Sequence, residues 1–171
     1  NFIHNIPVYS VSVALALGNE ILAGAVYEIG RDELFAAYKG GGAWLNGLQI
    51  KVSDTQSLEH ALMATGFPYY DFEQMESYLQ VLRQLMQKTH GLRRMGSAAV
   101  DLAYVACGRF EGFFEYGLNA WDVAAGVLLV KEAGGTVTDF KDGEDYLFGK
   151  SIVADNSHTH QALHDIIYKA F

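Results

Sequence analysis

The chain has 171 residues, of which half are apolar and about a fifth are charged, a composition typical of a folded protein rather than a disordered segment. It carries 12 Lys and Arg against 20 Asp and Glu, a formal net charge of −8, which argues against general nucleic-acid binding and against binding to anionic membranes. The longest apolar runs, 10–17 and 123–130, are far shorter than the roughly 20 residues that span a bilayer. With no signal sequence at the start, we expect a cytoplasmic protein.

The first part of the chain has the pattern of an antiparallel β-meander. Short runs of strand composition are separated by turn signals rich in glycine and asparagine. The expected strands are 9–17, 21–29, 34–38 and 49–52. A sheet of this kind needs other elements to cover it.

From about residue 57 the pattern changes to alternating strands and helices. The expected strands are 61–66, 110–115, 136–138 and 151–154, and the expected helices are 72–88, 97–107, 121–133 and 159–170. Strands that alternate with helices predict a parallel or mixed sheet covered by helices. The sequence therefore predicts an α/β (mixed α+β) fold that divides near residue 55 into two domains, 1–55 and 56–171.

Asp122 is the first candidate for a functional residue. It is expected in the first turn of a helix that follows a strand and a loop, and its neighbours are small and apolar. A carboxylate at this position is often only a helix cap or a partner of the helix dipole. In a confined cleft, however, it is the kind of oxygen ligand that Mg²⁺ requires.

Two further candidates lie at ends of predicted elements. Gly96, Ser97 and Ala98 form a junction of small residues before a helix, where backbone N–H groups favour anions; an ordinary serine cap explains the same pattern. Glu115 ends a strand, at the edge where α/β sheets bind ligands, although a solvent-facing glutamate is an equal alternative. Asp101, four residues after Ser97, is interpreted as a polar contact of its helix.

Other chemistry-bearing residues give weaker patterns. The glycines at 40–42 are followed by a hairpin rather than by a helix, so they predict a β-turn and not a phosphate-binding loop. The six histidines match no zinc-binding spacing, and we expect surface or capping roles for all of them. Cys107, the only cysteine, lies in an apolar run and is interpreted as a small buried hydrophobe.

Taken together, four segments resemble the inositol monophosphatase family. Residues 121–126 are similar to its W-D-x-A-A-G signature, 96–99 to its G-[ST]-A-A element, and 39–47 to its K-G-x-G-A-[FW]-x-N-G hairpin. Residues 1–4 resemble the tail of its other signature, D-P-[IL]-D-G-T-x-N-[FY]-x-H. The resemblance runs along the whole chain, with the elements in the family's order.

This resemblance implies a layered αβαβα fold and a Mg²⁺-dependent, lithium-sensitive phosphomonoesterase that forms homodimers. Asp122 would then be a ligand of the second magnesium ion and part of the substrate site. Glu115 would bind substrate hydroxyls, and the backbone at Gly96, Ser97 and Ala98 would contact sugar or phosphate. Arg93 would orient Glu115.

The chain departs from the family in one respect. Several of the family's metal-site residues would precede Asn1: the carboxylates and threonine of D-P-x-D-G-T and an upstream glutamate. The chain therefore resembles the C-terminal two-thirds of the family. No residue within it is expected to activate the attacking water. We therefore expect no measurable phosphatase activity from the chain alone. The favoured substrate is inositol 1-phosphate; alternatives are a 3′(2′),5′-bisphosphate nucleotide or fructose 1,6-bisphosphate, and a different class is a non-catalytic folding or dimerisation module.

Overall fold

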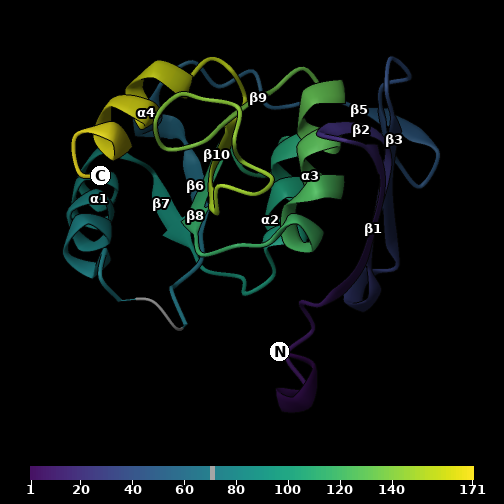
Figure 1. The fold of residues 1–171 in the computed structure, drawn as a ribbon, viewed down its shortest axis with the longest axis horizontal. Helices are drawn as coiled ribbons and strands as arrows, with labels where there is room; N and C mark the ends of the chain where they lie inside the picture. The colour runs from purple at the N-terminus through teal and green to yellow at the C-terminus, as the bar shows by residue number, and fades with distance from the viewer. Residues whose placement is uncertain (70–71) are drawn as a thin grey trace.

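The first five strands form one antiparallel sheet in the computed structural model of the chain, which describes residues 1–69 and 72–171 (Figure 1). The strands are adjacent in chain order: β1 (Ser10–Leu17), β2 (Glu20–Glu28), β3 (Glu33–Tyr38), β4 (Ala43–Leu45) and β5 (Leu48–Ile50). The expected meander is confirmed, with β4 as an addition. β4 and β5 form a hairpin around Asn46 and Gly47, whose φ angles of 48° and 81° suit the tight turn of twisted antiparallel strands.

The second sheet is mixed, as the alternating pattern predicts. Its strand order is β7 (Gly91–Arg93), β6 (Leu62–Thr65), β8 (Gly112–Tyr116), β10 (Ser151–Asp155) and β9 (Thr136–Thr138). β6 runs parallel to β7 and β8, whereas β10 runs antiparallel to β8 and β9. β7 was not expected, because three residues are too few to show a period.

Four α-helices complete the layers. α2 (Ala98–Ala106) and α3 (Ala120–Glu132) lie between the two sheets, while α1 (Met75–Lys88) and α4 (His160–Tyr168) cover the far face of the second sheet (Figure 1). Short 3₁₀ helices occur at Phe2–His4, Ile29–Arg31 and Leu58–His60. The expected helix 72–88 begins only at Met75, and residue 71 lies outside the described residues. The described residues thus supply four layers, β, α, β and α, of the mixed α+β fold.

Small residues allow α3 to fit between its neighbours. A Cβ atom on Gly24 of β2 would lie 2.9 Å from Ala125 Cα, and one on Gly126 would lie 2.5 Å from Leu102 Cβ of α2. Both distances are shorter than van der Waals contact, so neither glycine has room for a side chain. Close packing on both sides of α3 fixes the position of its first turn, which carries Asp122.

One apolar core joins both sheets through α2 and α3, and a second lies between the second sheet and the outer helices α1 and α4. Because the first core contains side chains of both sheets, it gives no boundary at residue 55, and the two-domain division stays a prediction.

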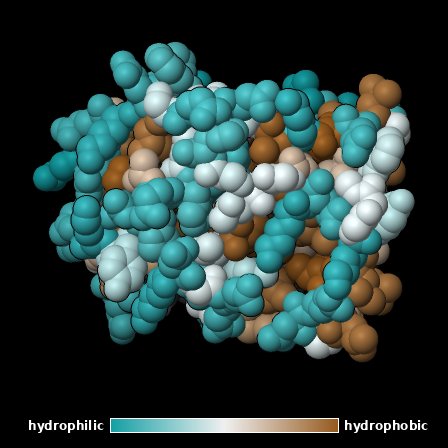
Figure 2. Space-filling view, turned by 90° about the horizontal axis from the view of Figure 1, so that it is seen from above, coloured by the Kyte–Doolittle hydropathy of each residue, from teal (hydrophilic) through white to brown (hydrophobic). Residues whose placement is uncertain are grey.

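The face of the first sheet that points away from α3 is apolar and exposed. Val11, Val13, Leu15 and Leu17 of β1 are 53–73 % exposed, and apolar side chains gather on the right-hand side of the molecule in Figure 2, the side of this sheet. None of the described helices is long and apolar enough to cross a membrane.

Candidate functional site

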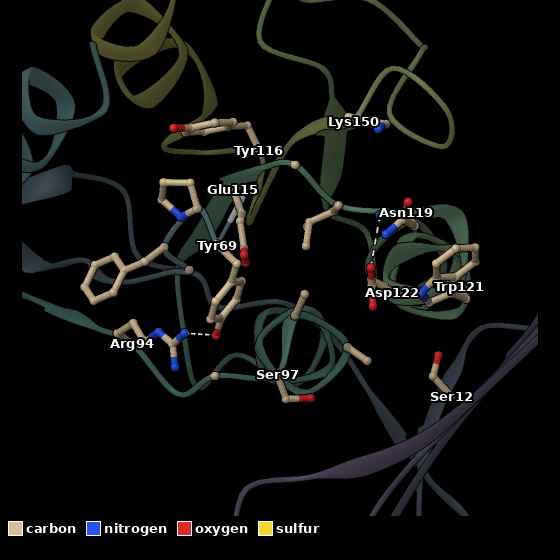
Figure 3. Close-up of a pocket in the computed structure, with 18 of the residues that line it drawn as sticks. Ser12, Tyr69, Arg94, Ser97, Glu115, Tyr116, Asn119, Trp121, Asp122 and Lys150 are labelled. Carbon is tan, nitrogen blue, oxygen red and sulfur yellow. Dashed lines mark hydrogen bonds between the residues drawn. The ribbon is translucent and has the colours of Figure 1, made fainter. Parts of the chain in front are cut away.

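A cavity of about 800 Å³ opens where the first turns of α2 and α3 meet the carboxyl ends of β6 and β8 (Figure 3). Ligands of α/β sheets bind at such strand ends, and this volume lies in the range of small-molecule sites. Every site residue expected from the sequence lines it: Gly96, Ser97, Ala98, Glu115 and Asp122. The cavity brings together five segments of the chain, within 10–12, 66–69, 94–99, 115–122 and at Lys150.

The first turn of α2 forms one wall of the cavity. Ser97 occupies the N-cap position, but its side chain makes no capping hydrogen bond and instead contacts the Ser10 hydroxyl at 3.4 Å. Gly96 has φ +89°, which a glycine adopts without strain. The first N–H groups of a helix have no partner within it, so an uncapped α2 presents free donors and a positive dipole end to the cavity.

Asp122 lies in the first turn of α3, with two different roles for its two oxygens. Oδ2 accepts a hydrogen bond from the Asn119 N–H at 3.0 Å, which is the capping role that a helix-start carboxylate often has. The other oxygen points away from Asn119 into the pocket (Figure 3). The cap therefore orients the carboxylate and leaves one oxygen for a ligand.

Glu115, near the end of β8, is only 7 % exposed, and its carboxyl group packs directly on Gly66. Burial raises the pKa of Glu115 to about 8, against the lowering effect of Arg94; the Asp122 charge raises it further. A carboxyl group with this pKa is largely protonated at neutral pH and can donate a hydrogen bond to a substrate hydroxyl as well as accept one.

The arginine beside Glu115 is Arg94, and the expectation for Arg93 was wrong. Arg93 is exposed and its guanidinium donates to the carbonyl of Leu92, whereas Arg94 lines the cavity. Arg94 also donates to the Tyr69 hydroxyl and lies 5.3 Å from the centre of the Phe67 ring. Consecutive side chains of a strand point to opposite faces, so an error of one position moves the charge to the wrong side.

Asp101 and His164 differ from what the sequence led us to expect. Asp101 is 1 % exposed, its Oδ1 has no hydrogen-bond partner, and burial raises its pKa to about 8, with the Glu115 charge as the next cause. It is therefore not a polar contact of its helix. His164 is buried rather than at the surface, and its Nε2 has no partner.

The sequence did not single out several other residues of the cavity, among them Tyr69, Trp121 and Lys150. Trp121 was noted only as part of a motif, yet its side chain is 72 % exposed at the cavity rim. A tryptophan directly before a carboxylate at a predicted helix start is a sequence signal that could have identified Trp121. Lys150 lies in a loop without a motif.

The residues of the cavity form only part of a metal-binding site. Among residues 1–69 and 72–171, no three His, Cys, Asp or Glu side chains are grouped so that they could hold a metal. Asp122 offers one oxygen of the right chemistry, and Mg²⁺ needs near-octahedral oxygen coordination, usually from one or two carboxylates together with water and substrate phosphate. The described residues therefore fit one ligand of such a site and do not form the whole of it.

Comparison with known proteins gives a consistent family. All of residues 1–171 match the inositol monophosphatase family. An inositol-1-monophosphatase of Rhizobium meliloti is 46 % identical over 169 residues, 99 % of this chain and 64 % of the relative. The Nus factor SuhB of Pseudomonas aeruginosa is 46 % identical over 165 residues, 95 % of this chain and 61 % of that protein.

Solved structures agree with the sequence comparison. The extragenic suppressor protein SuhB from Bartonella henselae superposes with a TM-score of 0.95 at 44 % identity, over 100 % of this chain and 66 % of that one. An IMPase from Thermotoga maritima gives a TM-score of 0.89 at 36 % identity, over 99 % of this chain and 65 % of that one. The chain thus spans about two thirds of the length of these relatives, and it belongs to the inositol monophosphatase family.

Proposed function

We propose that the protein to which this chain belongs is a Mg²⁺-dependent phosphomonoesterase that acts on inositol 1-phosphate or a related sugar phosphate. The observation that carries the proposal is the convergence of two helix starts on one cavity, with a free oxygen of Asp122 between them. Helix starts favour anions, while a carboxylate repels them. A divalent cation bound between Asp122 and the phosphate resolves this conflict and explains why both features occur in one pocket.

The residues of the chain itself have binding and orienting roles in this proposal. The free N–H groups at the start of α2, beside Gly96, Ser97 and Ala98, donate to the phosphate or the sugar. Glu115 hydrogen-bonds substrate hydroxyls, and Arg94 limits the rise of its pKa. Mg²⁺, when bound, supplies Lewis-acid stabilisation of charge on the phosphate and leaving oxygen. The described residues provide one ligand of such an ion, Asp122, and the other ligands have to come from elsewhere in the whole protein, from water or from the substrate.

The activity, the homodimeric state, the lithium sensitivity and the cytoplasmic location are proposals for the whole protein. For the 171-residue chain alone we expect no measurable phosphatase activity, since one carboxylate cannot assemble the metal site. Inositol 1-phosphate is favoured because two of the relatives are named inositol-1-monophosphatases. Bisphosphate nucleotides and fructose 1,6-bisphosphate are the alternatives in an assay panel.

The test separates the capping role of Asp122 from its role as a ligand. Asn at position 122 keeps an oxygen that accepts from the Asn119 N–H but loses the charge, whereas Ala loses both. In the whole protein, Asp122→Asn and Asp122→Ala should both abolish Mg²⁺-dependent hydrolysis of inositol 1-phosphate. Only Asp122→Ala should also lower stability, by about 1 kcal/mol, because it removes a helix cap. Full activity of Asp122→Asn would refute the proposal.

A second candidate is a non-catalytic function, because several relatives carry the name Nus factor SuhB rather than that of a phosphatase. Such a function would depend on a surface and not on the charge of Asp122. The Asp122→Asn variant therefore distinguishes the two: a cellular function that survives this substitution is not the hydrolysis of a phosphomonoester at this site.

A further inference from the structure

Tyr78, on the buried face of α1, carries a hydroxyl group into an apolar core. The same face of α1 places Val81 and Leu85 in this core, and both are apolar. Tyr78 is 2 % exposed, and a hydroxyl in such a place costs free energy unless it is hydrogen-bonded. The partners of the hydroxyl therefore indicate why α1 carries a tyrosine here in place of another apolar residue.

The Tyr78 hydroxyl is bonded at the carboxyl ends of β6 and β8, next to the cavity. It donates to the Gly66 carbonyl at 2.5 Å and lies 2.7 Å from the hydroxyl oxygen of Thr65. Thr65 in turn donates to the Phe114 carbonyl at 2.8 Å. Burial raises the pKa of Tyr78, so its hydroxyl keeps its proton and remains a donor. The two hydroxyls hold the peptide carbonyls of Gly66 and Phe114 in place.

Both of these peptides border Glu115. Phe114 directly precedes Glu115 in β8, and the Glu115 carboxyl group packs directly on Gly66. The Tyr78 ring also packs against the residues on both sides of Glu115, with centroid distances of 5.6 Å to Phe114 and 5.9 Å to Tyr116. From this frame Glu115 points into the cavity (Figure 3). Tyr78 therefore supports Glu115 from behind the wall of the cavity.

The support matters because a hydrogen bond to a substrate hydroxyl depends on both distance and angle. Gly66 has no side chain, so only its backbone can support the Glu115 carboxyl group. Without the Tyr78 hydroxyl, the buried Gly66 carbonyl would have to turn toward the Thr65 hydroxyl, which lies 3.3 Å away. The peptide on which Glu115 packs would then move, and the carboxyl group would move with it.

We propose that Tyr78 is a positioning residue that fixes the Glu115 carboxyl group, through the Gly66 and Phe114 peptides, for its hydrogen bond to a substrate hydroxyl. The proposal rests on the proposed phosphatase function and adds to it a residue from behind the cavity. Glu115 contacts the alcohol part of the substrate, which changes little during hydrolysis, so loss of the contact should raise KM and leave kcat unchanged. The expected rise is about three- to tenfold, the effect of one ordinary hydrogen bond.

The experiment measures steady-state hydrolysis by the whole protein with Mg²⁺ and two substrates: inositol 1-phosphate, which has ring hydroxyls, and 4-nitrophenyl phosphate, which has none. Tyr78→Phe removes the hydroxyl and keeps the ring. It should raise KM for inositol 1-phosphate about three- to tenfold, with kcat within about twofold. For 4-nitrophenyl phosphate it should leave both constants within about twofold, because Glu115 has no hydroxyl to bind there.

Two controls separate positioning from a loss of stability. In a Glu115→Ala background, Tyr78→Phe should have no further effect on KM for inositol 1-phosphate, because the group that it positions is gone. Thr89→Val removes a hydroxyl that donates to the Leu85 carbonyl at 2.7 Å, at the other end of α1, and should leave KM for both substrates unchanged.

The outcomes distinguish this proposal from the proposed function. An equal change of KM for the two substrates, or no change for either, overturns the role of Tyr78 and leaves the proposed function standing. A rise in KM that persists in the Glu115→Ala background does the same. If far-UV circular dichroism shows that Tyr78→Phe does not fold, Thr65→Val, which removes the hydroxyl that holds the Phe114 carbonyl, replaces it with the same expected selectivity. Absence of Mg²⁺-dependent hydrolysis of both substrates by the original protein overturns both proposals.

Discussion

The contact between Gly66 and Glu115 provides the sharpest test of the site geometry. A Cβ atom added at Gly66 would lie 2.0 Å from Glu115 Cδ and 2.1 Å from each carboxyl oxygen. Since carbon atoms in contact are about 3.5–4.0 Å apart, the carboxyl group would have to move by more than about 1 Å. Gly66 does not have a positive φ, so its backbone accepts alanine without strain, and we expect the destabilising part of Gly66→Ala to come from this overlap.

The cost of Gly66→Ala should therefore depend on Glu115. With Glu115 present, overpacking should lower the free energy of unfolding by about 1–3 kcal/mol. In Glu115→Ala the carboxyl group is gone, and the same change should be neutral or stabilise by about 0.4–1 kcal/mol through the unfolded state. The resulting coupling energy is about 1–4 kcal/mol, against about 0.5–3 kcal/mol for typical residues in contact.

Urea denaturation of the four proteins of this double-mutant cycle, followed by far-UV circular dichroism, measures the coupling, provided that the m-values agree. Gly91→Ala is the matched control, because a Cβ atom there would meet its nearest neighbours at 3.4 and 3.5 Å, which is ordinary contact. Its effect should be the same with and without Glu115. An equal cost of Gly66→Ala in both backgrounds would show that the Glu115 carboxyl group does not lie against Gly66.

Three other predictions concern stability. Burial raises the pKa of Asp101 from 3.8 to about 8, so the folded state binds the proton more tightly than the unfolded state. The free energy of unfolding should therefore fall as the pH rises from about 4 to about 8. Asp101→Asn should reduce that slope by up to about 1.4 kcal/mol per pH unit, measured by urea titrations at several pH values. Gly126→Ala should lower the free energy of unfolding by about 1–3 kcal/mol, measured in the same way, because its Cβ would overlap Leu102 at 2.5 Å; no change would mean that α3 packs less closely than described. Arg109 donates two hydrogen bonds of 2.6 Å to Glu33 and lowers the pKa of its carboxyl group. This pair should therefore stabilise the fold above the usual glutamate pKa and lose its effect as the pH falls. In Glu33→Gln the free energy of unfolding should depend less on pH on the acid side, and an unchanged pH dependence would contradict this role of the pair.

Local patterns in the sequence predicted most of the elements and five of the residues that line the cavity. Alternation, helical periodicity and turn residues act over a few positions, so they identify the meander, the helices and the junctions that carry Ser97 and Asp122. They also predict a mixed sheet, because strands alternate with helices along the chain. What such patterns report is which backbone conformation a segment prefers and which of its faces is apolar.

The tertiary structure decided what these faces meet. Whether Arg93 or Arg94 lies beside Glu115 depends on the register of β7, a strand too short to show a period. The burial of Asp101 likewise depends on how α2 packs against the rest of the fold. Packing joins residues far apart in the chain, and the free energy of those contacts has no local signature. For this reason the sequence predicts some members of the site, such as Ser97, Glu115 and Asp122, while Arg94, the protonation of Glu115 and the free oxygen of Asp122 are known only from the fold.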